Sequence, residues 1–196
     1  TEMSLEVSSM AVQVHGGMGF IEETGVAQMY RDAKILTIYE GTTAIQANDL
    51  VGRKILRENG ETLRELIADM RATTDAVRGD GTLGQIADTL TDAIDALESA
   101  TDWLLANGRE RLAEVLAGAV PYLYLLGTVS GGWQLARLAL AARGGLAAGQ
   151  GDGAYLTSLV DLVRFYMATI GPQALAHAET VREAGAALNH FDEASF

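Results

Sequence analysis

The stretch Leu83–Gly108, LGQIADTLTDAIDALESATDWLLANG, decides the fold of this 196-residue chain. Its apolar residues alternate at intervals of three and four, at Leu83, Ile86, Leu90, Ala93, Leu97, Ala100 and Leu104. That period places them on one stripe of a helix and leaves acidic residues on the outer face. Because three heptads are short for an independent coiled coil, we expect the stripe to lie in the core of a bundle. An interface between chains is the alternative.

The same helical period runs through much of the chain on both sides of this stretch. We expect helices over 61–77, 156–170 and 173–187, with Gly171-Pro172 separating the last two because proline starts a helix more readily than it continues one. The alternation of every second residue that marks a strand is almost absent. The sequence therefore predicts an all-α chain in which residues 60–196 form an antiparallel helical bundle of five or six helices.

The segment 115–136 carries no formally charged residue. A membrane span needs about 20 apolar residues, so spanning is one interpretation. We favour a central, almost fully buried bundle helix, because Thr128, Ser130 and Gln134 interrupt the apolar run. The glycine-rich segment 144–153 is predicted to be a loop.

Composition excludes several classes of function. The chain has 14 Lys and Arg against 26 Asp and Glu, a net charge of −12, which argues against nucleic-acid binding because phosphates need a basic face. It has no Cys, which excludes disulfides, thiolate zinc sites and cysteine nucleophiles and fits a cytoplasmic protein. The three histidines, His15, His177 and His190, lack metal-ligand spacing, so we predict no metal site.

The charge also separates a short first part from the bundle. Residues 1–59 carry a net charge of −3 and residues 60–196 a net charge of −9. The first part opens with a predicted helix over 2–15, whose apolar stripe consists of Met3, Val7, Met10 and Val14. A glycine loop at Gly16-Gly17 ends that helix, and we expect Thr24 to cap the next one.

The apolar run 35–39 leads to a carboxylate, a glycine and two threonines. We expect the run to be an extended connector, and Thr42 and Thr43 to cap a helix over 44–58 that stops at Asn59-Gly60. Desolvation after such a run would raise the pKa of the Glu40 carboxyl toward a range useful for a general base. A surface or capping role for Glu40 stays open on the residues alone.

Three blocks of the first part resemble the C-terminal signature of the acyl-CoA dehydrogenases. They are Gln13-Val14-His15-Gly16-Gly17-Met18-Gly19-Phe20, Tyr30-Arg31-Asp32-Ala33-Lys34-Ile35 and Ile38-Tyr39-Glu40-Gly41-Thr42-Thr43-Ala44-Ile45-Gln46. The resemblance covers residues 1–58, the last helices of the family's C-terminal helical domain. Residues 60–196 resemble the C-terminal extension of some bacterial members, chiefly through the run over 46–54 and the helical pattern.

This resemblance implies an FAD-dependent oxidation of an acyl-CoA thioester to a 2-enoyl-CoA. Glu40 aligns with the catalytic base that removes the α-proton while a hydride leaves the β-carbon for the flavin. Tyr39 and Gly41 would contact the substrate, and Thr42 would contact FAD. The residues implied to contact the adenosine-diphosphate part of FAD, from a neighbouring subunit, are Gln13, Val14, His15, Gly16 and Gly17.

The family also implies a setting in fatty acid metabolism. Its substrate would be an acyl-CoA, its electron acceptor an electron-transfer flavoprotein, and its assembly a homo-oligomer of two or four subunits. Because Thr1 is no initiator Met and the family's N-terminal and middle domains are missing, we expect a C-terminal fragment that is inactive alone. Two other hypotheses are a non-catalytic interaction or oligomerisation module at 60–196 and membrane docking through 115–136, which the net charge of −9 opposes.

Overall fold

A computed structural model describes residues 1–39, 41–188 and 190–191 of the chain. The described residues contain helices and turns and no strand, which confirms the predicted all-α class. They divide into two compact units, Thr1–Ala47 and Asn48–Phe196, and the division falls inside one helix. We describe each unit by itself.

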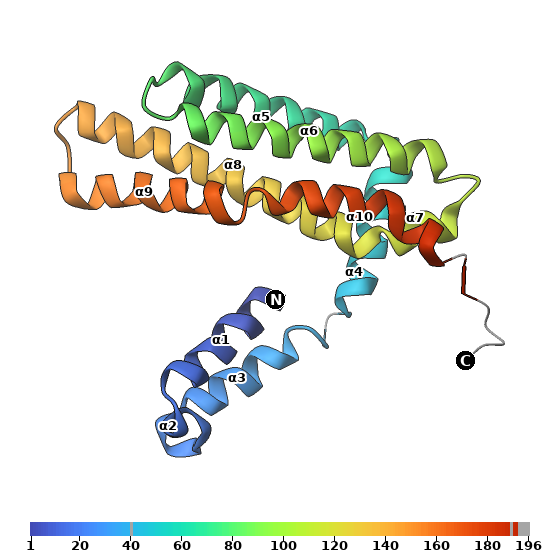
Figure 1. The fold of residues 1–196 in the computed structure, drawn as a ribbon, viewed down its shortest axis with the longest axis horizontal. Coiled ribbons are helices and arrows are strands. Elements are labelled where there is room, and N and C mark those ends of the chain that lie inside the picture. Colours follow the sequence, from blue (N-terminus) through green and yellow to red (C-terminus); the bar gives the residue numbers. More distant parts are fainter. Residues whose placement is uncertain (40, 189, 192–196) are drawn as a thin grey trace. The chain divides into compact units, whose positions relative to one another are not determined.

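The first unit is a helical hairpin with short connecting turns. Its elements are α1 (Glu2–Val14), α2 (Gly17–Phe20), a 3-10 turn (Glu22–Thr24), α3 (Val26–Ile35) and the start of α4 (Thr43–Asp49). Helices α1 and α3 lie side by side, and α2 joins them at one end (Figure 1). The predicted cap at Thr24 is wrong: Gly25, at φ +79°, precedes α3, and the Thr24 hydroxyl donates instead to the carbonyls of Met18 and Ile21.

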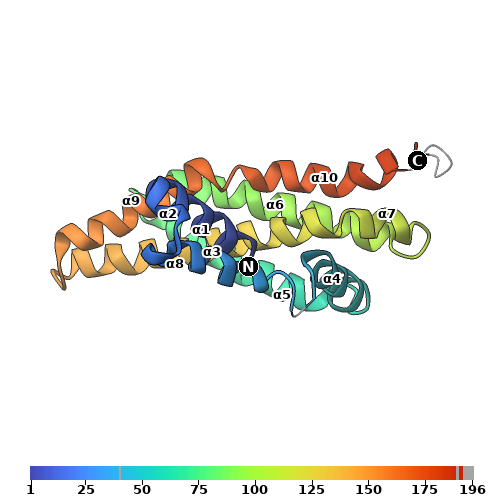
Figure 2. The same ribbon diagram turned by 90° about the horizontal axis from the view of Figure 1, so that it is seen from below.

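The second unit is the predicted bundle. After a π-helical segment (Leu50–Leu56) come α5 (Glu61–Gly79), α6 (Gly84–Asn107), α7 (Leu112–Ala117), α8 (Ala119–Ala147), α9 (Gly153–Thr169) and α10 (Gln173–Leu188). Asn59 and Gly60 both adopt positive φ, as expected for the predicted helix stop. Helices α9 and α10 follow one another along the bundle, separated at 170–172, and both pack on α8 (Figures 1 and 2).

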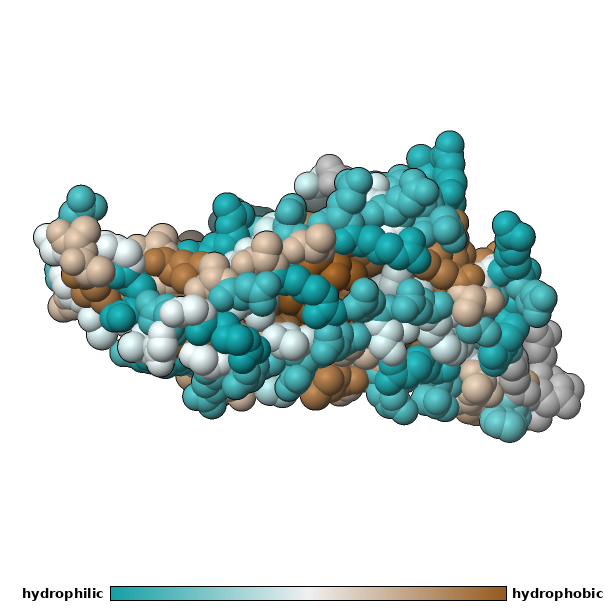
Figure 3. Space-filling view, turned by 90° about the horizontal axis from the view of Figure 1, so that it is seen from above, coloured by the Kyte–Doolittle hydropathy of each residue, from teal (hydrophilic) through white to brown (hydrophobic). Residues whose placement is uncertain are grey.

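The stripe of α6 forms the core of this bundle. Every residue of the predicted stripe, from Leu83 to Leu104, is at most 5% exposed. The prediction of a core rather than an interface is therefore confirmed. The molecular surface shown in Figure 3 is mostly hydrophilic, and its hydrophobic residues occupy a narrower band.

Helix α8 differs from its prediction in two ways. It is buried along one side only, at Ala119, Tyr122, Leu125, Val129, Gly132, Ala136, Ala139 and Ala142. It also continues to Ala147, so the predicted loop over 144–153 shortens to residues 148–152. Within the described part of the chain, no helix combines the length and apolar character that crossing a membrane requires.

Candidate functional site

The first candidate segment, Gln13–Gly17, lies where α1 ends. The His15 amide donates to the Ala11 carbonyl, and the Gly16 amide donates to the Gln13 carbonyl at 3.0 Å. Gly16 then adopts φ +58°, a region that favours glycine, and α2 begins at Gly17. The sequence thus reverses the chain direction here with two glycines.

All five residues of this segment are exposed in the described unit. An added Cβ at Gly16 or Gly17 would meet no described atom within 4 Å. The His15 ring nitrogen Nδ1 lies 2.9 Å from the Ala11 carbonyl oxygen. The loop therefore presents open backbone and one anchored imidazole on the surface of the unit.

Gly19 is a residue whose role the sequence reasoning missed. It is buried, and an added Cβ would overlap the Val12 carbonyl oxygen and lie 2.9 Å from the Cβ of His15. Only glycine lets α2 fold back on the end of α1. The signal was present in the repeated glycines of the motif, but a pattern does not tell which glycine is packed and which is open.

The second candidate segment starts with a correction. Residues 35–39 are not extended: amides of Leu36, Thr37 and Ile38 donate three residues back, which continues α3 as tight turns. The Thr37 hydroxyl donates to the Lys34 carbonyl and its side chain is buried. Local hydrogen bonds therefore override the β-branched composition, while Tyr39 remains 59% exposed.

Glu40, the predicted catalytic base, lies outside the described residues. Next to it, Gly41 adopts φ +90°, and an added Cβ would lie 3.4 Å from the Gln46 side chain. The Ile45 amide donates to the Thr42 hydroxyl oxygen at 3.4 Å, which confirms Thr42 as a cap of the following helix. Glycine at 41 thus allows a turn that a residue with a side chain would strain.

The two candidate segments are held at opposite ends of α1. The Thr43 hydroxyl donates to the Glu2 carboxylate, which ties the start of α4 to the first turn of α1. The segment Gln13–Gly17 lies at the other end of this 13-residue helix. At 1.5 Å per residue, the two segments are about 20 Å apart. One unit therefore does not bring all the predicted site residues together.

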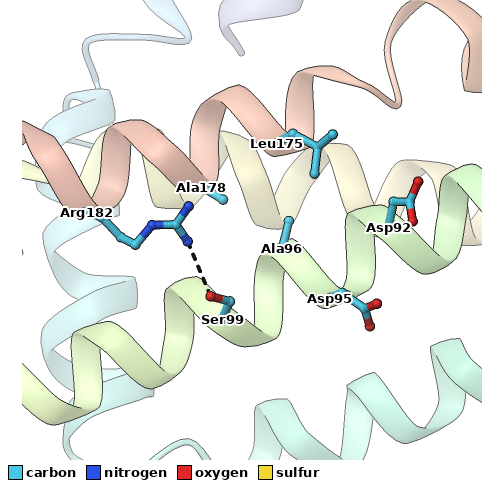
Figure 4. A pocket seen from close by; sticks show the side chains of 7 residues that line it. All are labelled: Asp92, Asp95, Ala96, Ser99, Leu175, Ala178 and Arg182. Atoms are coloured by element: carbon cyan, nitrogen blue, oxygen red, sulfur yellow. Dashed lines mark hydrogen bonds between the residues drawn. The ribbon is translucent and has the colours of Figure 1, made fainter.

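The second unit has shallow grooves on its described surface, one between α6 and α10 and another between α5 and α6. The polar lining of the groove between α6 and α10 includes Asp92, Asp95 and Arg182, whose guanidinium lies 3.3 Å from the Ser99 hydroxyl (Figure 4). Arg182 is also paired with Glu179. Among the described residues, no group of His, Asp and Glu could hold a metal ion. The site residues predicted from the sequence all lie in the first unit.

Comparisons with protein families cover both parts of the chain. Residues 1–56 match the family model described as "Acyl-CoA dehydrogenase, C-terminal domain". Residues 61–192 match the model described as "Acetyl-CoA dehydrogenase C-terminal like". The two matches follow one another in sequence and meet between residues 56 and 61.

Individual relatives give the same result. The chain is 45% identical over 96% of its length to 3-methylmercaptopropionyl-CoA dehydrogenase of Ruegeria pomeroyi and covers 32% of that protein. It is 32% identical over 95% of its length to broad-specificity linear acyl-CoA dehydrogenase FadE5 of Mycobacterium tuberculosis, again covering 32%. A shorter match, 50% identical over 24% of the chain and 12% of the relative, is to the caffeyl-CoA reductase-Etf complex subunit CarC of Acetobacterium woodii. The chain thus spans about a third of the length of its two long relatives.

Proposed function

The chain belongs to the acyl-CoA dehydrogenase family, and we propose that it supplies the C-terminal part of an enzyme that desaturates an acyl-CoA thioester between its α- and β-carbons. The observation that carries this proposal is the 45% identity over 96% of the chain, which includes both units. The proposed domains are 1–59, the end of the catalytic helical domain, and 60–196, the appended bundle.

Glu40 is the proposed catalytic base. It follows a turn that exposes Tyr39 and precedes Gly41, whose positive φ turns the chain. Its carboxylate would take the α-proton of the thioester, and the amide of the same residue would donate to the thioester oxygen as negative charge develops there. Tyr39 and Gly41 are the proposed substrate contacts beside it.

FAD is the proposed cofactor, and the residues present fit it. The exposed Thr42 hydroxyl and the open backbone at Gly16 and Gly17 leave room for a polar group to approach without a Cβ in the way. When bound, FAD would supply the acceptor for the β-hydride. Its proposed contacts in this chain are Thr42 and the segment Gln13–Gly17.

The two candidate segments lie about 20 Å apart along α1, which supports the proposal that they contact two different flavins, one in the same subunit and one in a neighbouring subunit. Thr42 would serve the flavin next to Glu40, and Gln13–Gly17 would contact the adenosine-diphosphate part of a flavin held by a neighbouring subunit. The enzyme would then be a homo-oligomer of two or four subunits. The name of the Acetobacterium relative supports an electron-transfer flavoprotein as electron acceptor. A cytoplasmic location and a role in fatty acid metabolism stay predictions.

The decisive experiment is Glu40→Gln in the full-length enzyme, assayed by anaerobic reduction of the bound flavin. Because a positioned base contributes about 10²- to 10⁴-fold, we expect a rate loss of that size with flavin content unchanged. The matched control is Glu23→Gln, which removes an exposed carboxylate of the same unit. A loss below about tenfold in Glu40→Gln would remove Glu40 as base.

A second experiment tests whether this chain alone is inactive. We expect a flavin titration of the 196-residue chain to show no tight stoichiometric binding, because its two candidate segments cannot meet around one ligand within one unit. Tight binding at one FAD per chain would contradict the proposal.

The appended bundle has a second candidate function as a non-catalytic interaction or oligomerisation module. Among its described residues, no group of His, Asp and Glu could hold a metal ion, and the apolar stripe of α6 is buried within the unit. Deleting 60–196 from the full-length enzyme tests this role. Unchanged oligomer size and unchanged kinetics would exclude it.

A further inference from the structure

The chain on either side of Glu40 is held by hydrogen bonds within the first unit. Before it, the amides of Thr37 and Tyr39 donate to carbonyls of α3 at 3.3 and 3.1 Å. After it, the Gln46 amide donates to the Thr42 carbonyl at 3.1 Å, at the start of α4. In sequence, the proposed base therefore lies between the turns that extend α3 and the first turn of α4.

The two flanks are connected to α1 in different ways. Helix α3 packs along α1, so a contact between helices holds the flank that precedes Glu40. The flank that follows Glu40 is joined to α1 by the hydrogen bond from the Thr43 hydroxyl to the Glu2 carboxylate. These two residues lie 41 positions apart in the chain, and both are half-buried. Because a hydrogen bond to a carboxylate is roughly twice as strong as one between neutral groups, this contact holds the start of α4 on α1.

Glu2 differs from Glu6, the other carboxylate of α1, which lies one turn further along the helix and is exposed. The helix dipole favours an acidic residue in the first turn, which would explain Glu2 by the start of α1 alone. That explanation leaves out the contact with Thr43, which belongs to the start of another helix. Thr42 already caps that second helix, so the hydrogen bond to Glu2 is not needed as a cap. Its effect is to fix where α4 starts relative to α1.

We propose that Glu2 is a positioning residue for the reaction, which acts through Thr43 on the short stretch of chain that carries Glu40. This inference rests on the proposed function, because it takes Glu40 as the base. Thr43 follows Glu40 by three residues, and Gly41 turns the chain between them at φ +90°. A shift at Thr43 therefore reaches Glu40 over very little backbone. A general base must lie about 2.6–3.2 Å from the group that it deprotonates, and a misplacement of about 1 Å can cost about 100-fold in rate.

The test measures anaerobic flavin reduction in the full-length enzyme, with whichever of butyryl-, octanoyl- and palmitoyl-CoA reduces the wild-type flavin fastest. We expect Glu2→Ala and Thr43→Val each to lower the limiting rate about 10- to 100-fold, because the base is misplaced. Flavin content and the half-saturating acyl-CoA concentration should stay unchanged, because binding does not depend on the base. Glu2→Gln keeps an acceptor oxygen and Thr43→Ser keeps the donor hydroxyl, so both should recover most of the rate. Glu6→Ala is the matched control and should behave as wild type.

A second series separates positioning of the base from a general effect on stability. In Glu40→Gln no base is left to position, so adding Thr43→Val should change the remaining rate by less than about twofold. A further loss as large as in wild type would overturn the proposal, because Thr43 would then act independently of Glu40.

Two other results would also overturn the proposal. One is a rate in Glu2→Ala equal to that in Glu6→Ala, and the other is a rate loss accompanied by an equal loss of flavin or of acyl-CoA affinity. If Glu2→Ala does not fold, Thr43→Val takes its place, because valine and threonine have nearly the same shape. A wild-type rate in Glu40→Gln would overturn the proposed function itself, whatever the Glu2 variants show, so the two failures are distinguishable.

Discussion

Helices α1 and α6 carry the same kind of apolar stripe, but the stripe of α6 is buried and that of α1 is exposed. In α6 the stripe is buried against α5, α8 and α10, and each of its residues is at most 5% exposed. In α1 the residues at the same intervals are 55–85% exposed. Periodicity therefore identifies which face of a helix must be covered. It does not say whether the cover lies in the same unit.

The two units also differ in how their polar groups are used. In the bundle, polar contacts bridge distant helices: Thr101 and Tyr122 share a buried hydrogen bond of 2.8 Å, and the Trp133 indole donates to Thr73. In the first unit, Thr24 and Thr37 donate to nearby backbone carbonyls, and the Thr43–Glu2 contact is a bridge between elements. The side-chain hydrogen bonds named here thus join separate helices in the bundle, whereas in the hairpin all but the Thr43–Glu2 contact stay within a short stretch of chain.

The largest expected effect separates the two stripes directly. Leu97→Ala removes a fully buried side chain of α6, and we expect it to lower the free energy of unfolding of this chain by about 2–5 kcal/mol. Met10→Ala truncates an exposed side chain of the α1 stripe, and we expect it to change the free energy of unfolding by no more than about 0.5 kcal/mol. Urea unfolding of both variants measures the contrast. Comparable losses would mean that α1 is as well buried as α6.

Substitution of glycine by alanine should destabilise the bundle at Gly185 and stabilise it at Gly127. An added Cβ at Gly185 would lie 2.5 Å from the backbone Cα of Glu114, so Gly185→Ala must push α10 from α7 at a cost of about 1–3 kcal/mol. Gly127 lies exposed within α8 with nothing within 4 Å of an added Cβ. Gly127→Ala should stabilise by about 0.5–1 kcal/mol. Thermal unfolding checks both signs, and a stabilising Gly185→Ala would refute the packing of α7 on α10.

The buried pair Thr101–Tyr122 offers a double-mutant cycle. Burial raises the pKa of the Tyr122 hydroxyl to about 12, so it stays protonated and able to donate at neutral pH. Thr101→Val leaves that hydroxyl without its partner and should cost about 1–3 kcal/mol. The double variant Thr101→Val/Tyr122→Phe should lose less unfolding free energy than the sum of the losses in the two single variants. Strict additivity of the unfolding free energies would mean that the two groups are not coupled.

The smallest expected effect is a pH dependence at His177. Burial lowers the pKa of this ring, which packs beside Tyr124 with 5.8 Å between ring centroids. The unfolded state then binds a proton at higher pH than the folded state does. Stability is full above the unfolded pKa of 6.5 and falls as the pH drops below it, toward the folded pKa. Between pH 7.5 and 5.5 the urea midpoint of wild type should therefore fall by more than that of His177→Gln, and equal decreases would contradict the prediction.

The sequence predicts the bundle better than the site. Regular spacing from Leu83 to Leu104 predicts the core of the bundle because the helices that cover this stripe, α5, α8 and α10, lie in the same unit. The run 35–39 shows why the rest fails: its composition predicts an extended connector, but backbone and side-chain hydrogen bonds, such as the one from the Thr37 hydroxyl, continue the helix as tight turns. Gly16 and Gly19 read alike in sequence, yet one is open and the other is packed on Val12. Whether a glycine is open or packed depends on where the neighbouring helix ends, and the local sequence pattern does not give that position.

The central claim is that the bundle buries the apolar stripe of α6 within this chain, whereas the exposed stripe of α1 belongs to the proposed longer enzyme, in which it is covered. Amide hydrogen exchange of the 196-residue chain and of the full-length protein, compared side by side, tests it most directly. We predict slow exchange along α6 in both proteins, and fast exchange along α1 in the chain that becomes slow in the full-length enzyme. Equal protection of α1 in both proteins would contradict the claim.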